Sequence, residues 1–292
     1  MKTKGFLQAI LSAAIFGAMP IFTKIVYSFG ADAVDAAFYR MSLSLIIMFI
    51  LNKFIYKESL KLNKLEVKFL LLASLGLLVT SIWLYNSYNY MDSGTATALH
   101  FSYPIIIFVA VSLIYKKKPR FIELACVLGV SVSIPMLTMG NANFHPLGIF
   151  FSIGSACTFA FYAIILQDQV FMKMPPIVKL FYINAFSSII IFAFSLVRGK
   201  PVLLSLSPMD FLIAFTYSCT ITLGATYLYQ NAIFLIGAKY TSIVSAIEPV
   251  VSSLIGVFIL NESIGYVQVF AIFLICLSTI VLVVSSRNYL EE

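Results

Sequence analysis

Apolar runs of about 20 residues recur along the whole chain and are separated by short polar segments, which matches the roughly 30 Å hydrocarbon core of a bilayer. Of the 292 residues, 61% are hydrophobic and only 11% are charged. Ordinary soluble domains are less apolar and more charged than this. The sequence therefore predicts an all-α integral membrane protein.

The apolar runs predict ten transmembrane helices, and nothing outside them is long enough for a soluble domain. The first run follows Lys2 and Lys4, as in a signal peptide, but lacks a convincing small-residue cleavage site, so we expect a retained span. The expected spans cover residues 5–29, 34–56, 68–91, 95–115, 120–140, 146–167, 177–197, 210–234, 240–260 and 265–285.

Lysine and arginine concentrate in alternate loops. If the amino terminus is cytoplasmic, all but four of the 19 basic residues lie on the cytoplasmic side. Arg198 and Lys200 then lie in an outer loop, whereas Lys24 and Arg40 fall within spans. This bias predicts a plasma-membrane (bacterial inner-membrane) protein with both termini in the cytoplasm. It also accounts for the net charge of +7 without nucleic-acid binding.

Three segments of the first half recur in the second at a nearly constant spacing. "FYRMSLSLIIMF" at 38–49 aligns with "FYINAFSSIIIF" at 181–192, and "TALHFSYP" at 97–104 aligns with "SIVSAIEP" at 242–249. "LYNS" at 84–87 aligns with "LYQN" at 228–231. We therefore expect two five-helix repeats, at residues 1–140 and 146–287. An odd number of helices inverts the second repeat, and inverted repeats are typical of secondary transporters.

The five-plus-five plan and the segment "AIEPVVSSLIGVFILNES" at 246–263 resemble the drug/metabolite transporter (DMT) superfamily, specifically its EamA type. The resemblance covers essentially the whole chain, and its most specific elements are the Glu-Pro pair, Gly256 and the acid Glu262. Two departures are Asn261, where such members often carry glycine, and "YKKKP" at 115–119, where the resemblance leads us to expect an acid. The resemblance implies a secondary transporter of small organic solutes, often a proton-driven exporter, in a superfamily that also contains importers and exchangers.

Glu248 lies near the centre of the expected span at 240–260, where inserting a charged side chain costs roughly 2.5 kcal/mol or more. Because removal from water favours the neutral carboxyl, Glu248 could carry the coupling proton or pair with a cationic group of the substrate. The structural alternative is an acid that caps backbone donors or pairs with a buried base.

Pro104 and Pro249 occupy equivalent positions in the two repeats, and each removes one backbone hydrogen bond, to the carbonyls of His100 and Ser245. We expect helix kinks that line a cavity or permit gating, although kinks without such a role also occur.

His100 lies on the same face as Pro104 and is a second candidate for proton coupling, because imidazole titrates near pH 6.5 in water. A satisfied packing histidine is the alternative. Arg40 could bind a substrate carboxylate or pair with Glu248, but an arginine near a helix end can also snorkel to the interface. The other expected substrate-binding side chains, each of which could instead only pack between helices, are Tyr103, Trp83, Asn86, Tyr39 and Gln230.

Other function classes find little support. No Walker sequence occurs, and the two histidines, His100 and His145, do not form the His-Glu-x-x-His motif of metalloproteases. The aspartates lie at span edges or in loops, so an intramembrane aspartyl protease is disfavoured. The four cysteines show no Cys-x-x-Cys spacing, and we expect neither a metal site nor a disulfide framework.

The sequence therefore predicts a secondary active transporter, not an enzyme, that needs no cofactor. Its substrate would be a small amphiphilic metabolite, such as an amino acid or amine, exported by alternating access in exchange for protons. The alternatives are an importer or exchanger of a cationic or quaternary-ammonium solute and, less favoured, an enzyme or a channel. The expected partners are the substrate, protons and the lipid bilayer, with no nucleic acid, and the protein would be a monomer or a homodimer.

Overall fold

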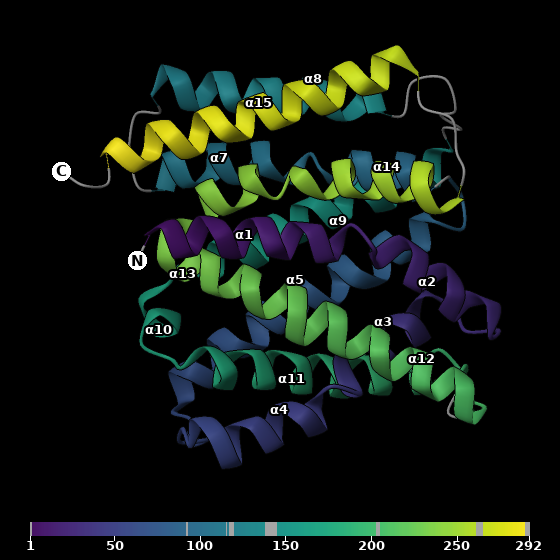
Figure 1. Ribbon diagram of the computed structural model, residues 1–292. Coiled ribbons are helices and arrows are strands. Elements are labelled where there is room, and N and C mark those ends of the chain that lie inside the picture. Colours follow the sequence, from purple (N-terminus) through teal and green to yellow (C-terminus); the bar gives the residue numbers. More distant parts are fainter. Residues whose placement is uncertain are drawn as a thin grey trace.

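The computed structural model describes residues 2–91, 93–114, 116, 120–137, 145–202, 205–260 and 265–289. All regular secondary structure in these ranges is helical (Figure 1). The helices, with the two π-helical stretches marked η, are α1 (Lys2–Phe16), α2 (Met19–Ser28), α3 (Ala33–Ser42), α4 (Leu45–Leu51), η1 (Asn52–Tyr56), α5 (Lys64–Ser87), α6 (Ser93–His100), α7 (Tyr103–Ile114), α8 (Phe121–Leu137), α9 (Pro146–Ile165), α10 (Gln169–Met172), α11 (Pro176–Val197), α12 (Pro208–Ser218), η2 (Cys219–Thr226), α13 (Tyr227–Val244), α14 (Ile247–Leu260) and α15 (Tyr266–Tyr289).

Eight helical segments in the described part of the chain are long and apolar enough to cross a bilayer, so this is a multi-pass, all-α membrane protein. One of them, Pro208–Val244, is 37 residues long and runs through α12, η2 and α13. The expected span at 120–140 corresponds to the shorter apolar helix α8, and residues 138–140 lie outside the described ranges. The expected span at 240–260 is divided between the end of α13 and α14.

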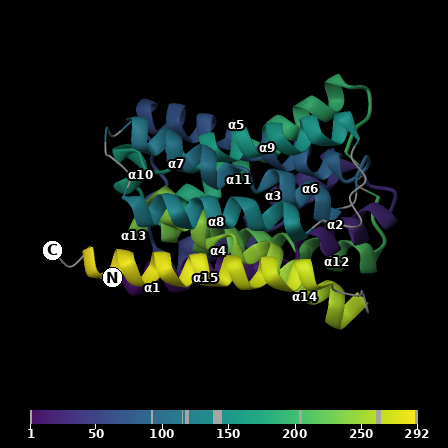
Figure 2. The same cartoon turned by 90° about the horizontal axis from the view of Figure 1, so that it is seen from above.

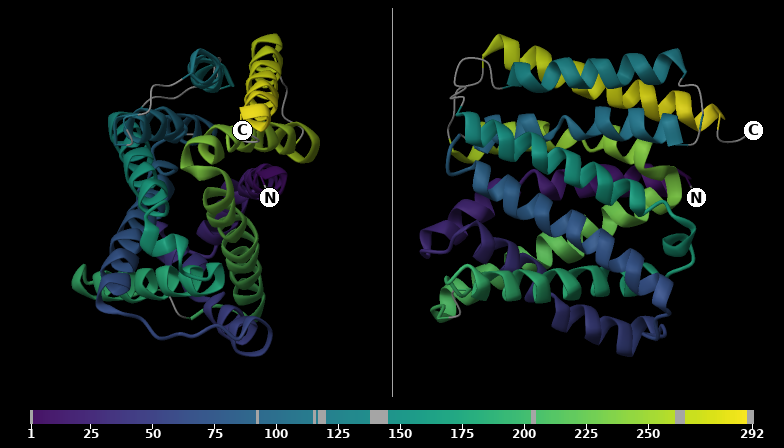
Figure 3. Two further views of the ribbon diagram at one scale, coloured as in Figure 1. Left: turned by 90° about the vertical axis from the view of Figure 1, so that its left-hand side faces the viewer. Right: turned by 180° about the vertical axis from the view of Figure 1, so that it is seen from behind.

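The long helices run roughly side by side, and both chain termini lie at the same end of the bundle (Figures 1 and 2). Helix α5 packs along α9, α1 along α13, and α8 along α15. The pair α8 and α15 forms one edge of the bundle, and α4 lies at the opposite edge (Figures 1 and 3). The buried core lies between them, among α1, α3, α5, α9 and α13.

Both predicted proline positions lie just after a helix break, where the sequence alone suggests single kinked spans. Helix α6 ends at His100 and α7 begins at Tyr103, while α13 ends at Val244 and α14 begins at Ile247. Each proline therefore lies in the first turn of a new helix, where its missing N–H leaves no bond unmade. The carbonyl of Ser245 accepts instead from the backbone N–H of Glu248, at 2.9 Å.

A further break interrupts α13 at Gly237, whose φ of 81° and ψ of 160° are accessible almost only to glycine. The backbone N–H of the next residue, Ala238, donates to the side-chain oxygen of Gln167 at 3.0 Å. This bend directs the last two turns of α13 away from the axis of its first part.

Candidate functional site

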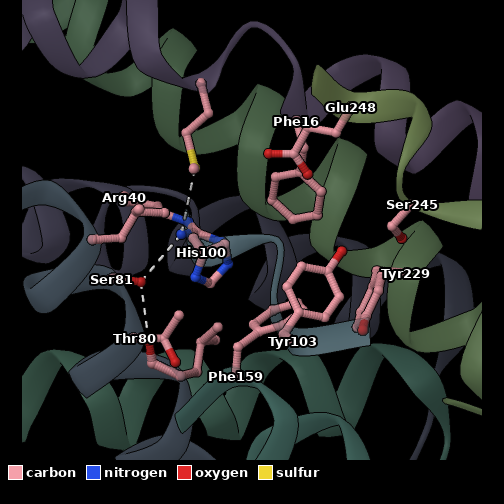
Figure 4. A pocket seen from close by; sticks show the side chains of 13 residues that line it. Phe16, Arg40, Thr80, Ser81, His100, Tyr103, Phe159, Tyr229, Ser245 and Glu248 are labelled. Atoms are coloured by element: carbon pink, nitrogen blue, oxygen red, sulfur yellow. Dashed lines mark hydrogen bonds between the residues drawn. The ribbon is translucent and has the colours of Figure 1, made fainter. Parts of the chain in front are cut away.

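A small cavity lies in the middle of the bundle (Figure 4). Its volume, taken as the space that the centre of a water molecule can occupy, is about 30 Å³. Since one water needs about 10–15 Å³ by this measure, the cavity has room for a few waters. A metabolite requires the surrounding helices to separate. The lining residues come from both halves of the chain: Phe16, Met19, Arg40, Leu77, Thr80, Ser81, Leu84, His100, Tyr103, Phe159, Tyr229, Ser245 and Glu248.

The two helix breaks explain why polar groups reach the bundle centre. His100 is the last residue of α6 and Tyr103 the first of α7, while Glu248 is the second residue of α14. The amino-terminal ends of α7 and α14 thus adjoin the cavity, and their partial positive charge favours an acidic side chain or an anionic group there. The sequence repeat therefore places equivalent helix starts beside one cavity.

Arg40 lies inside the bundle and does not snorkel, since it is only 5% exposed. One terminal nitrogen, Nη1, donates to the Ser81 and Tyr85 hydroxyls, each at 3.1 Å, and Nη2 donates to the Thr226 hydroxyl at 3.3 Å. The guanidinium also lies 5.7 Å from the centre of the Phe16 ring. A buried positive charge is thus held by neutral oxygens and an aromatic ring.

Helix α3 is fixed against the junction of α12 and η2 through the backbone of Arg40. The hydroxyls of Ser218 and Thr222 both donate to the Arg40 carbonyl, each at 2.7 Å. The position of Arg40 in the first half is thereby tied to a π-helical stretch of the second half. Such π-helical stretches occur frequently at functional sites.

Glu248 is 8% exposed and enters the cavity from a different side than Arg40 (Figure 4). Across the described ranges, neither Arg40 nor Glu248 takes part in an ion pair. The sequence-based suggestion that these two residues pair directly is therefore not realised in this conformation. The cavity has a cationic and an acidic group that do not contact each other.

His100 is hydrogen-bonded through Nδ1 to the hydroxyl of Ser155, at 2.8 Å. Because that hydroxyl donates its own proton to the carbonyl of Ser152 at 2.6 Å, Nδ1 must be the donor to Ser155. The neutral tautomer with the proton on Nδ1 leaves Nε2 as an acceptor, so the imidazole can take up a proton without losing this bond.

Aromatic rings form much of the remaining wall. Phe159 contacts Tyr103 edge-on, with ring centres 4.7 Å apart, and Tyr229 at 5.2 Å. The Tyr229 hydroxyl is buried and has no hydrogen-bond partner among the described residues. Its unsatisfied donor is available to a polar group inside the cavity.

Four expected substrate-binding residues lie outside the cavity lining. Trp83 packs against the rings of two α9 phenylalanines, and Tyr39 is buried beside Phe38. Asn86 accepts a hydrogen bond from the Asn89 side chain at 3.3 Å. Gln230 donates to the Tyr162 hydroxyl at 2.9 Å.

Sequence reasoning did not single out several lining residues. Ser245 had a detectable signal, because it is the repeat counterpart of His100. Phe16 and Phe159 had none, since a phenylalanine in an apolar helix looks the same whether it faces lipid or a cavity. Asn261, Glu262 and the segment 117–119 lie outside the described residues.

Comparison with known proteins gives consistent matches. The model of the EamA-like transporter family matches twice, at residues 3–139 and 146–284. An uncharacterized transporter of Synechocystis sp. is 24% identical over 68% of this chain and 60% of its own length. The uncharacterized inner membrane transporter YicL of Salmonella typhimurium is 24% identical over 98% of this chain and 97% of its own length.

The fold has also been seen in a solved crystal structure. That structure superposes with a TM-score of 0.79 over 99% of both chains at 14% sequence identity. At this identity the likeness concerns the fold alone.

Proposed function

Because this chain belongs to the EamA-like transporter family, we propose that it is a secondary active transporter whose inverted halves, residues 1–140 and 146–287, move by alternating access. The two family-model matches and the shared location of both termini at one end of the bundle support this arrangement. We place the protein in the plasma or bacterial inner membrane with both termini in the cytoplasm, in keeping with its basic loops.

The proposed substrate is a small zwitterionic or amine-bearing metabolite, such as an amino acid. The observation that carries this proposal is that Arg40 and Glu248 border one cavity without contacting each other. A carboxylate placed toward Arg40 and an ammonium placed toward Glu248 would neutralise both groups at once, which offsets the cost of keeping unpaired charges inside the membrane. The aromatic wall suits an apolar side chain or an ammonium group.

We propose that Glu248 is the coupling residue and that His100 assists as a second proton carrier. An acid that holds either a proton or the substrate ammonium, but not both, links the two fluxes in opposite directions. Proton entry would then drive export. A substrate-bearing state needs a larger cavity, and we propose that the breaks before Pro104 and Pro249 allow α7 and α14 to move apart.

The alternative is an importer or exchanger of a cationic or quaternary-ammonium solute. The aromatic rings of Phe16, Tyr103, Phe159 and Tyr229 favour it, because the faces of aromatic rings attract such cations. In either case we propose that Trp83, Asn86, Tyr39 and Gln230 support the cavity wall from outside.

Transport by purified protein in liposomes tests the proposal. A panel of amino acids and amines is offered under an imposed pH gradient, and Glu248→Gln is expected to abolish the pH-driven flux while the protein stays folded. Glu58→Gln, which changes an exposed loop carboxylate, is the matched control. Unchanged pH dependence in Glu248→Gln would exclude Glu248 as the coupling residue.

The charge on Arg40 separates the two substrate classes. Arg40→Met is expected to raise the KM for an apolar amino acid by tenfold or more and to leave the KM for the corresponding amine, which lacks the carboxylate, nearly unchanged. An equal rise in KM for both compounds would show that Arg40 supports the cavity wall and does not bind the substrate carboxylate.

A further inference from the structure

An ionic cluster around one buried carboxylate joins the two halves at the end of the bundle that holds the chain termini. The carboxylate of Glu123, at the start of α8, accepts from Lys239 Nζ and from the Tyr240 hydroxyl of α13, each at 2.8 Å. It also pairs with Arg120 at 3.2 Å. The Glu123 side chain is 4% exposed and that of Lys239 15%. We call these four residues the terminus-side cluster.

The terminus-side cluster has contacts beyond its own ion pairs. Lys239 Nζ lies 4.6 Å from the centre of the Phe108 ring on α7, and Arg120 donates to the carbonyl of Ser285 on α15 at 3.5 Å. The cluster therefore connects α7 and α8 of the first half with α13 and α15 of the second.

A second ionic cluster joins the halves at the opposite end. Asp32, which caps α3, accepts from Arg198 at 2.8 and 3.3 Å and from Lys200 at 2.9 Å. Both basic residues follow the end of α11. Asp32 and Arg198 are 26% and 22% exposed, so this far-side cluster is wetter than the terminus-side cluster.

The cavity lies between the two clusters and shares one helix with each of them. On α7, Tyr103 lines the cavity and Phe108 touches the terminus-side cluster, five residues or roughly 8 Å farther along. On α3, Asp32 caps the helix and Arg40 lines the cavity, eight residues or roughly 12 Å away. Separating the halves at either end therefore requires breaking the cluster at that end.

We propose that these clusters are the two gates of the transport pathway, and that each cycle breaks one while the other stays closed. The proposal rests on the alternating-access part of the proposed function and is independent of the substrate. The structure, with both clusters formed around a cavity of water size, is then the occluded state. The drier terminus-side cluster is the tighter gate, because a buried pair loses more than an exposed one when a partner is removed.

Access of a water-soluble thiol reagent to the cavity tests the gates. Ser245→Cys serves as the reporter in protein whose four cysteines are replaced by alanine, and a terminal tag identifies the membrane side of the termini. Glu123→Gln is expected to increase labelling from the terminus side by about tenfold or more, because Lys239 and Arg120 then favour water over the closed gate. Asp32→Asn is expected to produce a smaller increase from the far side only.

Matched controls change acids that do not join the halves. Glu58→Gln alters an exposed loop acid, and Asp210→Asn alters an acid that accepts a hydrogen bond from the Ser207 hydroxyl at the start of its own helix. Both are expected to label as the parent protein does. The double reversal Glu123→Lys with Lys239→Glu is expected to restore low labelling, which a general loosening of the fold would not do.

If Glu123→Gln does not fold, Lys239→Met opens the same gate from the other partner and gives the same readout. The proposal would be overturned if the variants of both clusters label at the parent level, or if labelling rises equally from both sides of the membrane. Labelling needs no transported solute. Altered labelling without amino acid transport would therefore support the two gates and reject the proposed substrate.

Discussion

Gly17, in the turn between α1 and α2, gives a prediction whose magnitude follows from the structure. A Cβ at this position would lie 2.8 Å from Val251 Cβ and 3.0 Å from the backbone oxygen of Glu248. Ordinary contacts begin at 3.4 Å, so α1 and α14 must separate by about 0.6 Å. Neither atom belongs to the flexible end of a side chain, and the backbone that carries Glu248 has to move.

Overpacking of this kind costs roughly 1–3 kcal/mol, and replacing glycine by alanine in helical backbone returns roughly 0.5–1 kcal/mol. The net destabilisation of Gly17→Ala is then about 0–2.5 kcal/mol. Gly224 is the matched control, because it also faces α1 but its added Cβ would meet only the end of the Ile15 side chain, at 3.4 Å. Gly224→Ala is expected to be neutral or slightly stabilising.

Thermal unfolding of both variants in detergent, followed by fluorescence, measures the difference. Gly17→Ala should lower the midpoint by a few degrees relative to Gly224→Ala. Its pH-driven transport should fall by more than the loss of folded protein explains, because the shift displaces Glu248 from the cavity. Equal midpoints and equal transport for the two variants would refute the inference that α1 and α14 are in closest contact at Gly17.

Three further predictions concern other parts of the bundle. Gly237→Ala should cost about 1–3 kcal/mol, measured by thermal unfolding, because alanine rarely adopts the φ of 81° found there; a neutral effect would show that the bend is not fixed. Arg40→Lys should lower the thermal midpoint and slow transport, because an ammonium cannot span the hydroxyls of α5 and Thr226 as a planar guanidinium does; wild-type values in the variant would contradict this. Burial would raise the pKa of Asp32, but bonds from Arg198, the Asp35 backbone and Lys200 outweigh it and hold the pKa well below the usual value of 3.8. The resulting stability is complete above that pH and is lost as the pH falls below it, so Asp32→Asn should flatten the fall in thermal midpoint in acid.

The class of this protein and much of its helical layout could be predicted from the sequence. Apolar runs of membrane length leave the backbone no option except helix, because lipid offers no hydrogen bonds. The Glu-Pro pair and its counterpart at Pro104 marked the two places where α14 and α7 begin. The family resemblance read from these residues is confirmed by the family-model matches.

The residues that line the cavity could be predicted only in part. Glu248, His100, Tyr103 and Arg40 line it, and Trp83 and Asn86 on α5 do not. Helix α5 is apolar on all sides, so periodicity does not show which face turns inward. In a soluble protein water would mark the outer face, but in a membrane lipid and protein interior are equally apolar.

The sequence by itself determined that the chain spans a membrane, that its helices are kinked or broken near Pro104 and Pro249, and that Glu248 lies deep in an apolar segment, since these depend on local chemistry. Only the tertiary structure decided that Arg40 and Glu248 face one cavity without touching, and that Glu123 meets Lys239. Those relations join residues far apart in the chain, and they depend on how each helix is rotated and packed against its neighbours.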